Sequence, residues 1–261
     1  MTVLFGGVGV ALVTLFDQAG EADPVATAAL AADLAGRGMR AVLACGTTGE
    51  AGTLTPDERS AVIRAVRDAV PDGIPVLAGT GAVTAAEAAR LTAAACAAGA
   101  DAVLAWPPPG STGLAGYYRA VAEAAGPGVP VLAYHVPWVS APGVPVASLG
   151  SLPVAGIKDS SGSADRLLDE VAHYQGPVYV GSSALLALAG PLGVAGAILA
   201  LANVEPERCR RAFAGDGTAQ RELAVRHLEV KAGGPPALKR ILAEQRGTVP
   251  ASRLVRLAGT G

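Results

Sequence analysis

Lys158 directly follows a short apolar run, Val154–Ile157, in the sequence Gly-Ile-Lys-Asp-Ser-Ser-Gly. An interior strand would remove water from its ammonium group, which disfavours the charged form and lowers the lysine pKa from its ordinary value of about 10.4. A neutral amine attacks a ketone, which is the first step of Schiff-base formation. The structural alternative is a lysine that points outward or pairs with Asp159. Only two other lysines occur, Lys231 and Lys239, so each can be examined for function.

Tyr134 ends another apolar run, Val129–Tyr134, which comes before the lysine run in the chain. A phenol at the end of a strand can move protons. Carbinolamine formation, dehydration and C–C bond cleavage all need such a group. The alternative is a core tyrosine whose hydroxyl group bonds to the backbone.

The sequence Gly46-Thr47-Thr48-Gly49-Glu50 follows the apolar run Ala41–Cys45. Glycines let the backbone turn tightly and approach a ligand. Exposed amides and two hydroxyl groups can hold a carboxylate. We therefore treat Gly46, Thr47 and Thr48 as candidate substrate-binding residues, with an ordinary turn between strand and helix as the alternative.

Eight short apolar runs alternate along the chain with longer, Ala-rich amphipathic segments. Because these runs lack polar alternation, each fits a strand that is buried on both faces, as in a parallel sheet. We predict strands at Val8–Thr14, Ala41–Cys45, Pro75–Gly79, Ala102–Trp106, Val129–Tyr134, Val154–Lys158, Val178–Gly181 and Gly196–Leu199.

Residues that start and stop helices delimit the segments between these runs. Asp23 and Thr55 each precede a proline, which is the pattern of an N-cap followed by proline at the first helical position. Glycines follow several of the segments. We predict helices at Pro24–Gly36, Pro56–Val70, Ala85–Ala98, Leu114–Ala125, Ala164–Tyr174, Glu207–Ala214, Ala219–Lys231 and Pro236–Glu244, with a short tail near Ser252.

Eight strands that alternate with helices predict a parallel α/β fold. A closed barrel and an open doubly wound sheet both fit, but the strand count and the length of 261 residues favour a (β/α)8 TIM barrel with extra C-terminal helices. The dinucleotide pattern Gly-x-Gly-x-x-Gly does not follow the first strand, and no Gly-x-x-x-x-Gly-Lys-Ser/Thr sequence occurs. We expect one domain, in which residues 1–215 form the barrel with the active site and residues 216–261 form a helical extension packed on it.

Composition narrows the classes of partner. The hydrophobic fraction of 51% supports a large core, and a net charge of -2 without a basic block gives no reason to expect nucleic acid or a membrane surface as a partner. No apolar run reaches the roughly 18 residues of a membrane span. Cys45, Cys96 and Cys209 are widely spaced and odd in number, so we expect reduced thiols in a cytoplasmic protein and no metal site.

Taken together, Gly46–Glu50, Tyr134-His135-Val136-Pro137 and Gly156-Ile157-Lys158-Asp159 resemble, in this order and spacing, the dihydrodipicolinate synthase/N-acetylneuraminate lyase family of class I aldolases. The segments Leu77–Gly81 and Gly196–Asn203 resemble that family's third and eighth strands. The resemblance runs from about residue 8 to residue 203 and is vague beyond that point.

The resemblance implies a role for each of these residues. Lys158 would form the Schiff base, and Tyr134 would be the acid/base group. Thr47 and Thr48 would bind the carboxylate of a 2-oxo acid, and one of them would link to Tyr134 in a proton relay. Family members are usually tetramers built from barrel dimers, and no cofactor is implied because the protonated imine is itself the electron sink. The residues expected to line the pocket near the imine are Gly181 and Ile198.

Two departures from the family's pattern bear on the second substrate. The synthases carry a tyrosine pair after the fourth strand, where this chain reads Trp106-Pro107-Pro108-Pro109. They also carry an arginine shortly after the Tyr-x-x-Pro proline, where this chain reads Trp138-Val139-Ser140. Loss of that carboxylate partner would cost roughly 2–5 kcal/mol if nothing replaced it. Trp106, His135 and Trp138 therefore predict a more apolar or aromatic site for the second substrate, with His135 either supplying a proton or supporting the site from behind.

These observations predict a metal-independent lyase or aldolase that forms a Schiff base between Lys158 and pyruvate or a related 2-oxo acid. Its partners would be that acid and an aldehyde that the sequence does not identify, and the chain would be a homo-oligomer, a dimer or tetramer. One alternative is 4-hydroxy-tetrahydrodipicolinate synthase, which joins pyruvate and aspartate semialdehyde. Another is a homologue that binds a 2-oxo acid without catalysis.

Overall fold

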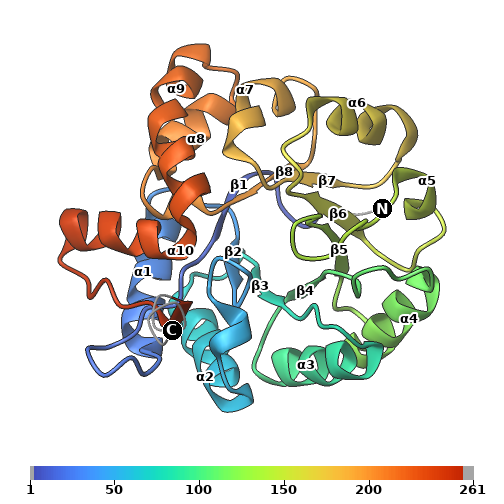
Figure 1. Cartoon of the computed structure of the whole chain (residues 1–261), viewed down its shortest axis with the longest axis horizontal. Helices are drawn as coiled ribbons and strands as arrows, with labels where there is room; N and C mark the ends of the chain where they lie inside the picture. The colour runs from blue at the N-terminus through green and yellow to red at the C-terminus, as the bar shows by residue number, and fades with distance from the viewer. Residues whose placement is uncertain (1–2, 255–261) are drawn as a thin grey trace.

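The computed structural model describes residues 3–254 and has eight parallel strands that close into a barrel in sequence order (Figure 1). This confirms the predicted (β/α)8 TIM barrel with extra C-terminal helices. The last strand pairs with the first from Gly7↔Gly196 to Val10↔Leu199, which closes the barrel. The strands are β1 (Gly7–Ala11), β2 (Val42–Ala44), β3 (Val76–Gly79), β4 (Ala102–Ala105), β5 (Val131–His135), β6 (Gly156–Asp159), β7 (Val178–Val180) and β8 (Gly196–Leu199).

Helices surround the strands in the same order along the chain (Figure 1). The short helices α5 and α7 and three 3-10 turns had no counterpart in the sequence prediction, because four-residue helices carry too little periodicity to register. The helices are α1 (Pro24–Gly36), α2 (Pro56–Ala69), α3 (Ala85–Ala97), α4 (Leu114–Ala125), α5 (Val146–Leu149), α6 (Ala164–His173), α7 (Leu186–Ala189), α8 (Pro206–Phe213), α9 (Gly217–Glu222) and α10 (Ala224–Arg246), and the turns are η1 (Ala51–Thr53), η2 (Ser183–Leu185) and η3 (Leu201–Asn203).

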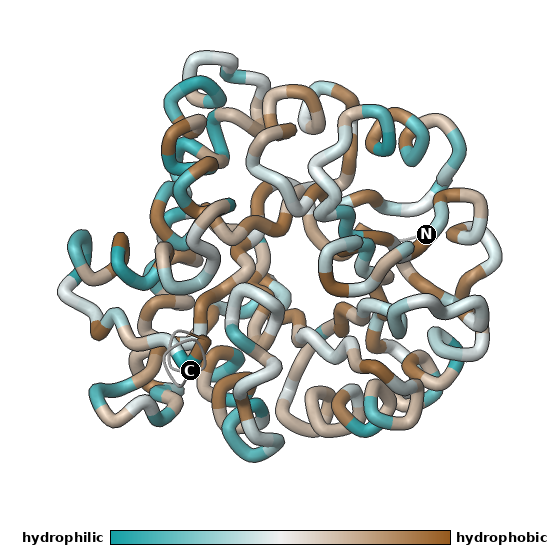
Figure 2. Tube along the Cα trace, viewed as in Figure 1, coloured by the Kyte–Doolittle hydropathy of each residue, from teal (hydrophilic) through white to brown (hydrophobic). Residues whose placement is uncertain are grey.

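The strands are largely apolar, as expected for strands that are buried on both faces, and the charged residues Lys158 and Asp159 occur in β6. One set of side chains packs against the helices and forms the larger core. The other set points into the barrel, where Leu43, Leu77, Leu104, Leu132 and Ile198 are each at most 1% exposed. Figure 2 shows hydrophobic residues along the strands and hydrophilic residues mainly on the outer helices.

The end of the barrel where the strands begin is plugged, so a ligand must enter from the other end. Phe5 stacks on Tyr179 with ring centroids 4.7 Å apart. The hydroxyl group of Tyr179 accepts from the backbone N–H of Leu4 at 3.0 Å. At the opposite end the buried Asn203 amide donates to Ala11 O at 2.8 Å and accepts from Val13 N at 3.1 Å, which ties η3 to the first strand.

The helix α10 is broken at Gly234, whose φ of 56° is a left-handed value that favours glycine. Pro235 and Pro236 follow the break, and proline cannot donate a helical hydrogen bond. The sequence prediction had placed a gap between two helices at this point. After the break, the far end of α10 is joined to α1 by an ion pair of 2.7 Å between Arg246 and Asp33. The predicted short helix near Ser252 falls largely outside the described residues.

Within residues 3–254, no helix has both the length and the apolar character needed to cross a membrane.

Candidate active site

Lys158 and Tyr134 face the barrel interior on neighbouring strands, because β5 and β6 pair with Tyr134 opposite Lys158. Lys158 is only 4% exposed, and its Nζ lies 4.5 Å from the centroid of the Tyr134 ring. The neighbouring Asp159 points the other way, since side chains alternate along a strand. The Asp159 carboxylate accepts from Ser161 N at 2.8 Å and from Ser161 Oγ at 2.9 Å. The alternative that Lys158 pairs with Asp159 is therefore not realised.

A cavity of about 520 Å3 opens above Lys158 at the carboxyl ends of the strands. In a TIM barrel this is the end at which active sites are built. The structure brings most of the predicted site residues to the wall of this cavity: Thr47, Thr48, Tyr134, Trp138, Lys158, Gly181 and Ile198.

Three predicted substrate-binding residues, Gly46, Trp106 and His135, do not line this cavity. Gly46 and Trp106 line a second cavity of about 730 Å3, which shares Thr47 and Tyr134 with the first. The aromatic second-substrate site expected from Trp106, His135 and Trp138 is thus not assembled; of the three, only Trp138 reaches the first cavity.

His135 follows Tyr134 and so points away from the barrel interior. Its Nδ1 accepts from Val144 N at 3.1 Å, and a Cβ on Gly143 would overlap the ring. Burial, reinforced by the charge of Arg166, lowers the pKa of His135 to about 4. His135 is therefore neutral at pH 7 and supports the loop after β5 from behind, rather than supplying a proton to the cavity.

Ser160 is a cavity residue that the sequence analysis missed. Its hydroxyl group donates to the Tyr134 hydroxyl at 3.3 Å, and both side chains line the cavity beside Lys158. Within the described residues, neither Thr47 nor Thr48 forms the expected hydrogen bond to Tyr134. The sequence does indicate this residue, because side chains two positions apart on a strand point to the same face and position 160 lies two residues after Lys158.

Gly181 holds this arrangement open, since a Cβ at position 181 would overlap the Ser160 hydroxyl oxygen. Gly181→Ala is therefore expected to displace Ser160 and to lower kcat by roughly tenfold to a hundredfold, the scale of a small misplacement in an active site. Steady-state kinetics on Gly181→Ala, Ser160→Ala and the double variant check this. If the glycine acts through Ser160, the double variant is no slower than the slower single one. Native turnover in Gly181→Ala would contradict the prediction.

One wall of the cavity comes from α10, which the sequence analysis had not connected with the site. His227, Val230 and Lys231 line it together with Gly234. The first three of these positions are three residues and one residue apart, which places them on one face of the helix, and Gly234 lies where the helix breaks. Nδ1 of His227 lies 2.8 Å from Ser183 Oγ, which joins α10 to the loop after β7. The helical spacing of His227, Val230 and Lys231 can be recognised in the sequence. The surface against which this face of α10 packs cannot.

The loop that carries Thr47 and Thr48 is held through Glu50, a buried residue with a left-handed φ of 54°. One oxygen of the Glu50 carboxylate accepts from Lys239 Nζ at 2.5 Å, and neither side chain is exposed to solvent. The other oxygen accepts from the Ser252 hydroxyl at 2.9 Å and from the backbone N–H groups of Arg253 and Leu254 at 2.9 and 3.1 Å. Residues from the end of the chain thus fix the threonine loop.

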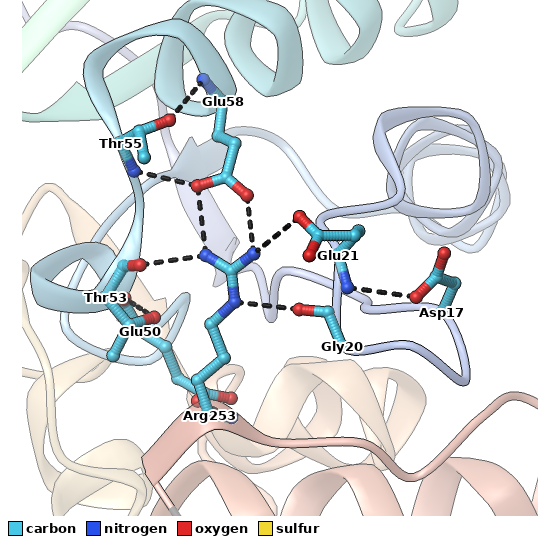
Figure 3. A network of polar contacts seen from close by, with 8 residues as sticks. All are labelled: Asp17, Gly20, Glu21, Glu50, Thr53, Thr55, Glu58 and Arg253. Atoms are coloured by element: carbon cyan, nitrogen blue, oxygen red, sulfur yellow. Dashed lines mark hydrogen bonds and ion pairs between the residues drawn. The ribbon is translucent and has the colours of Figure 1, made fainter. Parts of the chain in front are cut away.

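Arg253 strengthens this attachment (Figure 3). Its guanidinium group forms a two-pronged contact with Glu58, at 2.9 and 2.5 Å, and donates to Thr53 O and Gly20 O at 2.8 Å each. The hydrogen bonds from Arg253 lower the pKa of the Glu58 carboxyl group to about 2. A two-pronged contact of this kind is stronger and more directional than a single ion pair.

Comparison with known proteins identifies the family. The model of the dihydrodipicolinate synthetase family matches residues 4–231. The chain belongs to the dihydrodipicolinate synthetase family. The resemblance predicted from the sequence is therefore confirmed, and so is the prediction of an enzyme of the class I, pyruvate-dependent aldolase/lyase type.

Three relatives from this family illustrate the similarity. The 4-hydroxy-tetrahydrodipicolinate synthase of Thioalkalivibrio sulfidiphilus is 36% identical over 265 residues, which cover 95% of this chain and 90% of that protein. The enzyme of the same name from Pseudomonas aeruginosa is 38% identical over 235 residues, which cover 84% and 80%. The crystal structure of dihydrodipicolinate synthase from Acinetobacter baumannii complexed with pyruvate aligns with a TM-score of 0.84 and 29% identity, covering 98% of this chain and 96% of that chain.

Tyr117 and Tyr118 lie on α4, shortly after residues 106–109, where the resemblance to the synthases implies a tyrosine pair. Tyr117 donates to Trp106 O at 2.7 Å and Tyr118 donates to Ala105 O at 3.1 Å. Burial raises the pKa of Tyr117 to about 12. Both hydroxyl groups are committed to backbone carbonyls and neither side chain lines the cavity with Lys158. They do not replace the missing pair in this chain.

Proposed function

We propose that this member of the dihydrodipicolinate synthetase family uses Lys158 to form a Schiff base with pyruvate or a related 2-oxo acid, and then makes or breaks a C–C bond to an aldehyde. The observation that carries the proposal is a buried lysine at the floor of the cavity, next to a tyrosine and without an ion-pair partner among residues 3–254. A lysine so placed is removed from bulk water and faces the space that a small keto acid would occupy.

In the proposed reaction the Lys158 amine adds to the keto carbon, and loss of one water molecule leaves a protonated imine. The imine draws electrons from the adjacent carbon, so loss of a proton from the methyl group gives an enamine. The enamine carbon attacks the aldehyde carbon, and the aldehyde oxygen takes up a proton. Water then hydrolyses the new imine, which releases a 4-hydroxy-2-oxo acid and restores the lysine. Cleavage is the same sequence reversed.

Thr47 and Thr48 would hold the carboxylate of the 2-oxo acid. Both line the cavity, and their loop is fixed by the buried Glu50 carboxylate. Hydrogen bonds to a charged group contribute on the order of 1.5–3 kcal/mol each. This contact would place the keto carbon over Lys158 before reaction, which is the main contribution of a rigid site.

Tyr134 would carry protons between the reacting oxygen atoms and water, with Ser160 orienting its hydroxyl group. Tyr134→Phe is therefore expected to slow turnover by roughly 10²–10⁴, the usual scale for a general acid or base. Ser160→Ala, which keeps the phenol, should slow it less. Single-turnover measurement of imine formation checks both variants, and a change below tenfold in Tyr134→Phe would mean that another group moves the protons.

A second candidate is 4-hydroxy-tetrahydrodipicolinate synthase itself, because the relatives at 36% and 38% identity carry that name. Against it stand the missing tyrosine pair and the missing arginine. A condensation assay with pyruvate and aspartate semialdehyde separates the two candidates. Fast turnover with this pair favours the synthase, whereas turnover only with other aldehydes favours a different aldolase.

Borohydride trapping tests the proposal directly. Reduction of the protein in the presence of pyruvate should add the mass of the reduced adduct to the peptide that carries Lys158. A panel of 2-oxo acids would then rank the first substrate. Absence of any adduct would favour the homologue that binds without catalysis.

We also propose a cytoplasmic homo-oligomer, a dimer or tetramer, that acts on small molecules and needs no cofactor beyond the covalent imine. The free thiols of Cys45, Cys96 and Cys209 fit a reducing compartment. The homo-oligomer is supported by the resemblance to a family whose members are usually tetramers built from barrel dimers. Light scattering on the purified protein measures it.

A further inference from the structure

The cavity above Lys158 carries charge of only one sign. Its charged lining residues are Lys158 at the floor and Lys231 on α10, with His227 beside Lys231. Within the part of the chain that the structure describes, no Asp or Glu lines this cavity. The remaining polar lining is mainly hydroxyl groups from serine and threonine. A wall of this kind favours a negatively charged ligand, because nothing in it repels an anion.

Lys231 has no competing partner of its own. Among residues 3–254 it forms no ion pair, and Glu229, two residues earlier on the same helix, pairs with Arg226 at 2.7 Å. Lys231 is exposed while Lys158 is buried, so the two lysines lie at the mouth and at the floor of one cavity.

The helix face that carries Lys231 is held in place. The break at Gly234 ends the first half of α10 at the cavity wall, and Gly234 and Pro235 line the cavity themselves. The contact of 2.8 Å between His227 and Ser183 joins this half to the loop after β7. A cation on a fixed face can select a ligand, whereas a cation on a free tail only attracts one.

We propose that Lys231, positioned by the His227–Ser183 contact, determines the second substrate by binding an acidic group on the aldehyde. This inference rests on the proposed function, because it assumes that the 2-oxo acid occupies the Lys158 end of the cavity. The aldehyde carbon would then face the enamine and its acidic group would reach the mouth. The anchor comes from α10, far in sequence from the segment after Pro137 where the arginine is missing.

The acidic group is a carboxylate or a phosphate, and two aldehydes distinguish them. Succinic semialdehyde carries a carboxylate, and glyceraldehyde 3-phosphate carries a phosphate. Butanal has the carbon skeleton of succinic semialdehyde without the acid, so it reports on the uncharged part of recognition. Condensation of each with pyruvate is followed by mass spectrometry of the product and by pyruvate consumption.

Lys231→Ala is expected to lower kcat/KM for the preferred acidic aldehyde by roughly tenfold to a hundredfold, the range of one hydrogen bond to a charged group. The loss should fall on KM, and the butanal rate should stay within about twofold. Lys231→Arg should recover most of the loss. Arg240→Ala is the matched control, because it removes a positive charge from an exposed position of the same helix that does not line the cavity.

Equal losses with acidic and neutral aldehydes in Lys231→Ala, or native preference for butanal, would overturn the proposal. A readout that needs no turnover keeps this separate from failure of the Schiff-base proposal. Calorimetry compares the binding of succinic semialdehyde and glyceraldehyde 3-phosphate to Lys158→Ala and to the Lys158→Ala, Lys231→Ala double variant. Weaker binding of either aldehyde in the double variant supports the anchor even if no adduct with pyruvate is ever trapped, and equal binding of both refutes it.

Discussion

Replacing Lys158 with alanine is expected to abolish the borohydride-trapped adduct and to lower turnover by more than roughly 10⁴-fold, as removal of a covalent nucleophile does in other enzymes. The reason is that, within residues 3–254, no other amine lies at the floor of the cavity: Lys231 is exposed at the mouth and Lys239 is paired with Glu50. Intact-mass analysis after reduction with pyruvate, together with steady-state kinetics, measures both effects.

The same substitution should leave the fold intact and should not lower the melting temperature. Burial of the Lys158 amine, whose side chain has no hydrogen-bond partner among residues 3–254, opposes folding, so its removal is expected to be neutral or stabilising. Lys158→Arg is the matched control, because it keeps the charge but offers a guanidinium group that remains protonated. An adduct that persists in Lys158→Ala would mean that another residue forms the imine. A loss of helical circular dichroism would mean that the lysine is structural.

Lys239→Ala is expected to destabilise the protein strongly, because Lys239 on α10 holds the loop that carries the threonines through Glu50. Both side chains of the Lys239–Glu50 pair are fully buried, so removing the lysine leaves a carboxylate without its charge partner. Breaking such a pair costs about 3–5 kcal/mol. For a chain of this length the melting temperature should fall by on the order of 10 °C. Thermal unfolding followed by circular dichroism measures the change.

A double variant separates the pair from its surroundings. Glu50→Gln with Lys239→Met removes both charges and keeps similar volumes, so it should recover much of the lost stability. Because Glu50 fixes the loop of Thr47 and Thr48, KM for the 2-oxo acid should rise in Lys239→Ala more than kcat falls. A melting temperature unchanged in Lys239→Ala would show that the pair contributes nothing, and an unchanged KM would show that the threonines are held by other contacts.

Most of the barrel was predictable from the sequence because strands buried on both faces and capped helices leave local signals. The bounds of α1 and α4 agree with the prediction, and β8 was placed at Gly196–Leu199. Asp23 and Thr55 cap their helices through side-chain hydrogen bonds, as their positions before proline indicated. Most other element ends differ from the prediction by one to three residues, which is where hydrogen-bond patterns rather than composition decide. The predicted helix Ala219–Lys231 is wrong as a single element, because the structure divides it between α9, which ends at Glu222, and α10, which begins at Ala224.

The floor of the site was predictable for the same reason, since Lys158 and Tyr134 end buried strands. The direction of His135 follows from that of Tyr134, because neighbouring side chains on a strand point to opposite faces. The mouth was not predictable. The α10 wall depends on contacts such as that between Ser183 and His227, which are 44 residues apart. No local pattern encodes which loop a distant helix will meet.

The attachment of Glu50 to the end of the chain has a consequence for how the protein is made and how it decays. All eight strands are complete once residue 199 has been synthesised, but Lys239 and Arg253 follow Glu50 by 189 and 203 residues. We therefore expect a nascent chain to form a closed barrel before the contacts of Glu50 with Lys239 and Arg253 fix the threonine loop. Proteolytic removal of residues 239–254 would likewise leave a closed barrel without the Glu50 contacts, and under the proposed function we expect such a copy to bind the 2-oxo acid more weakly.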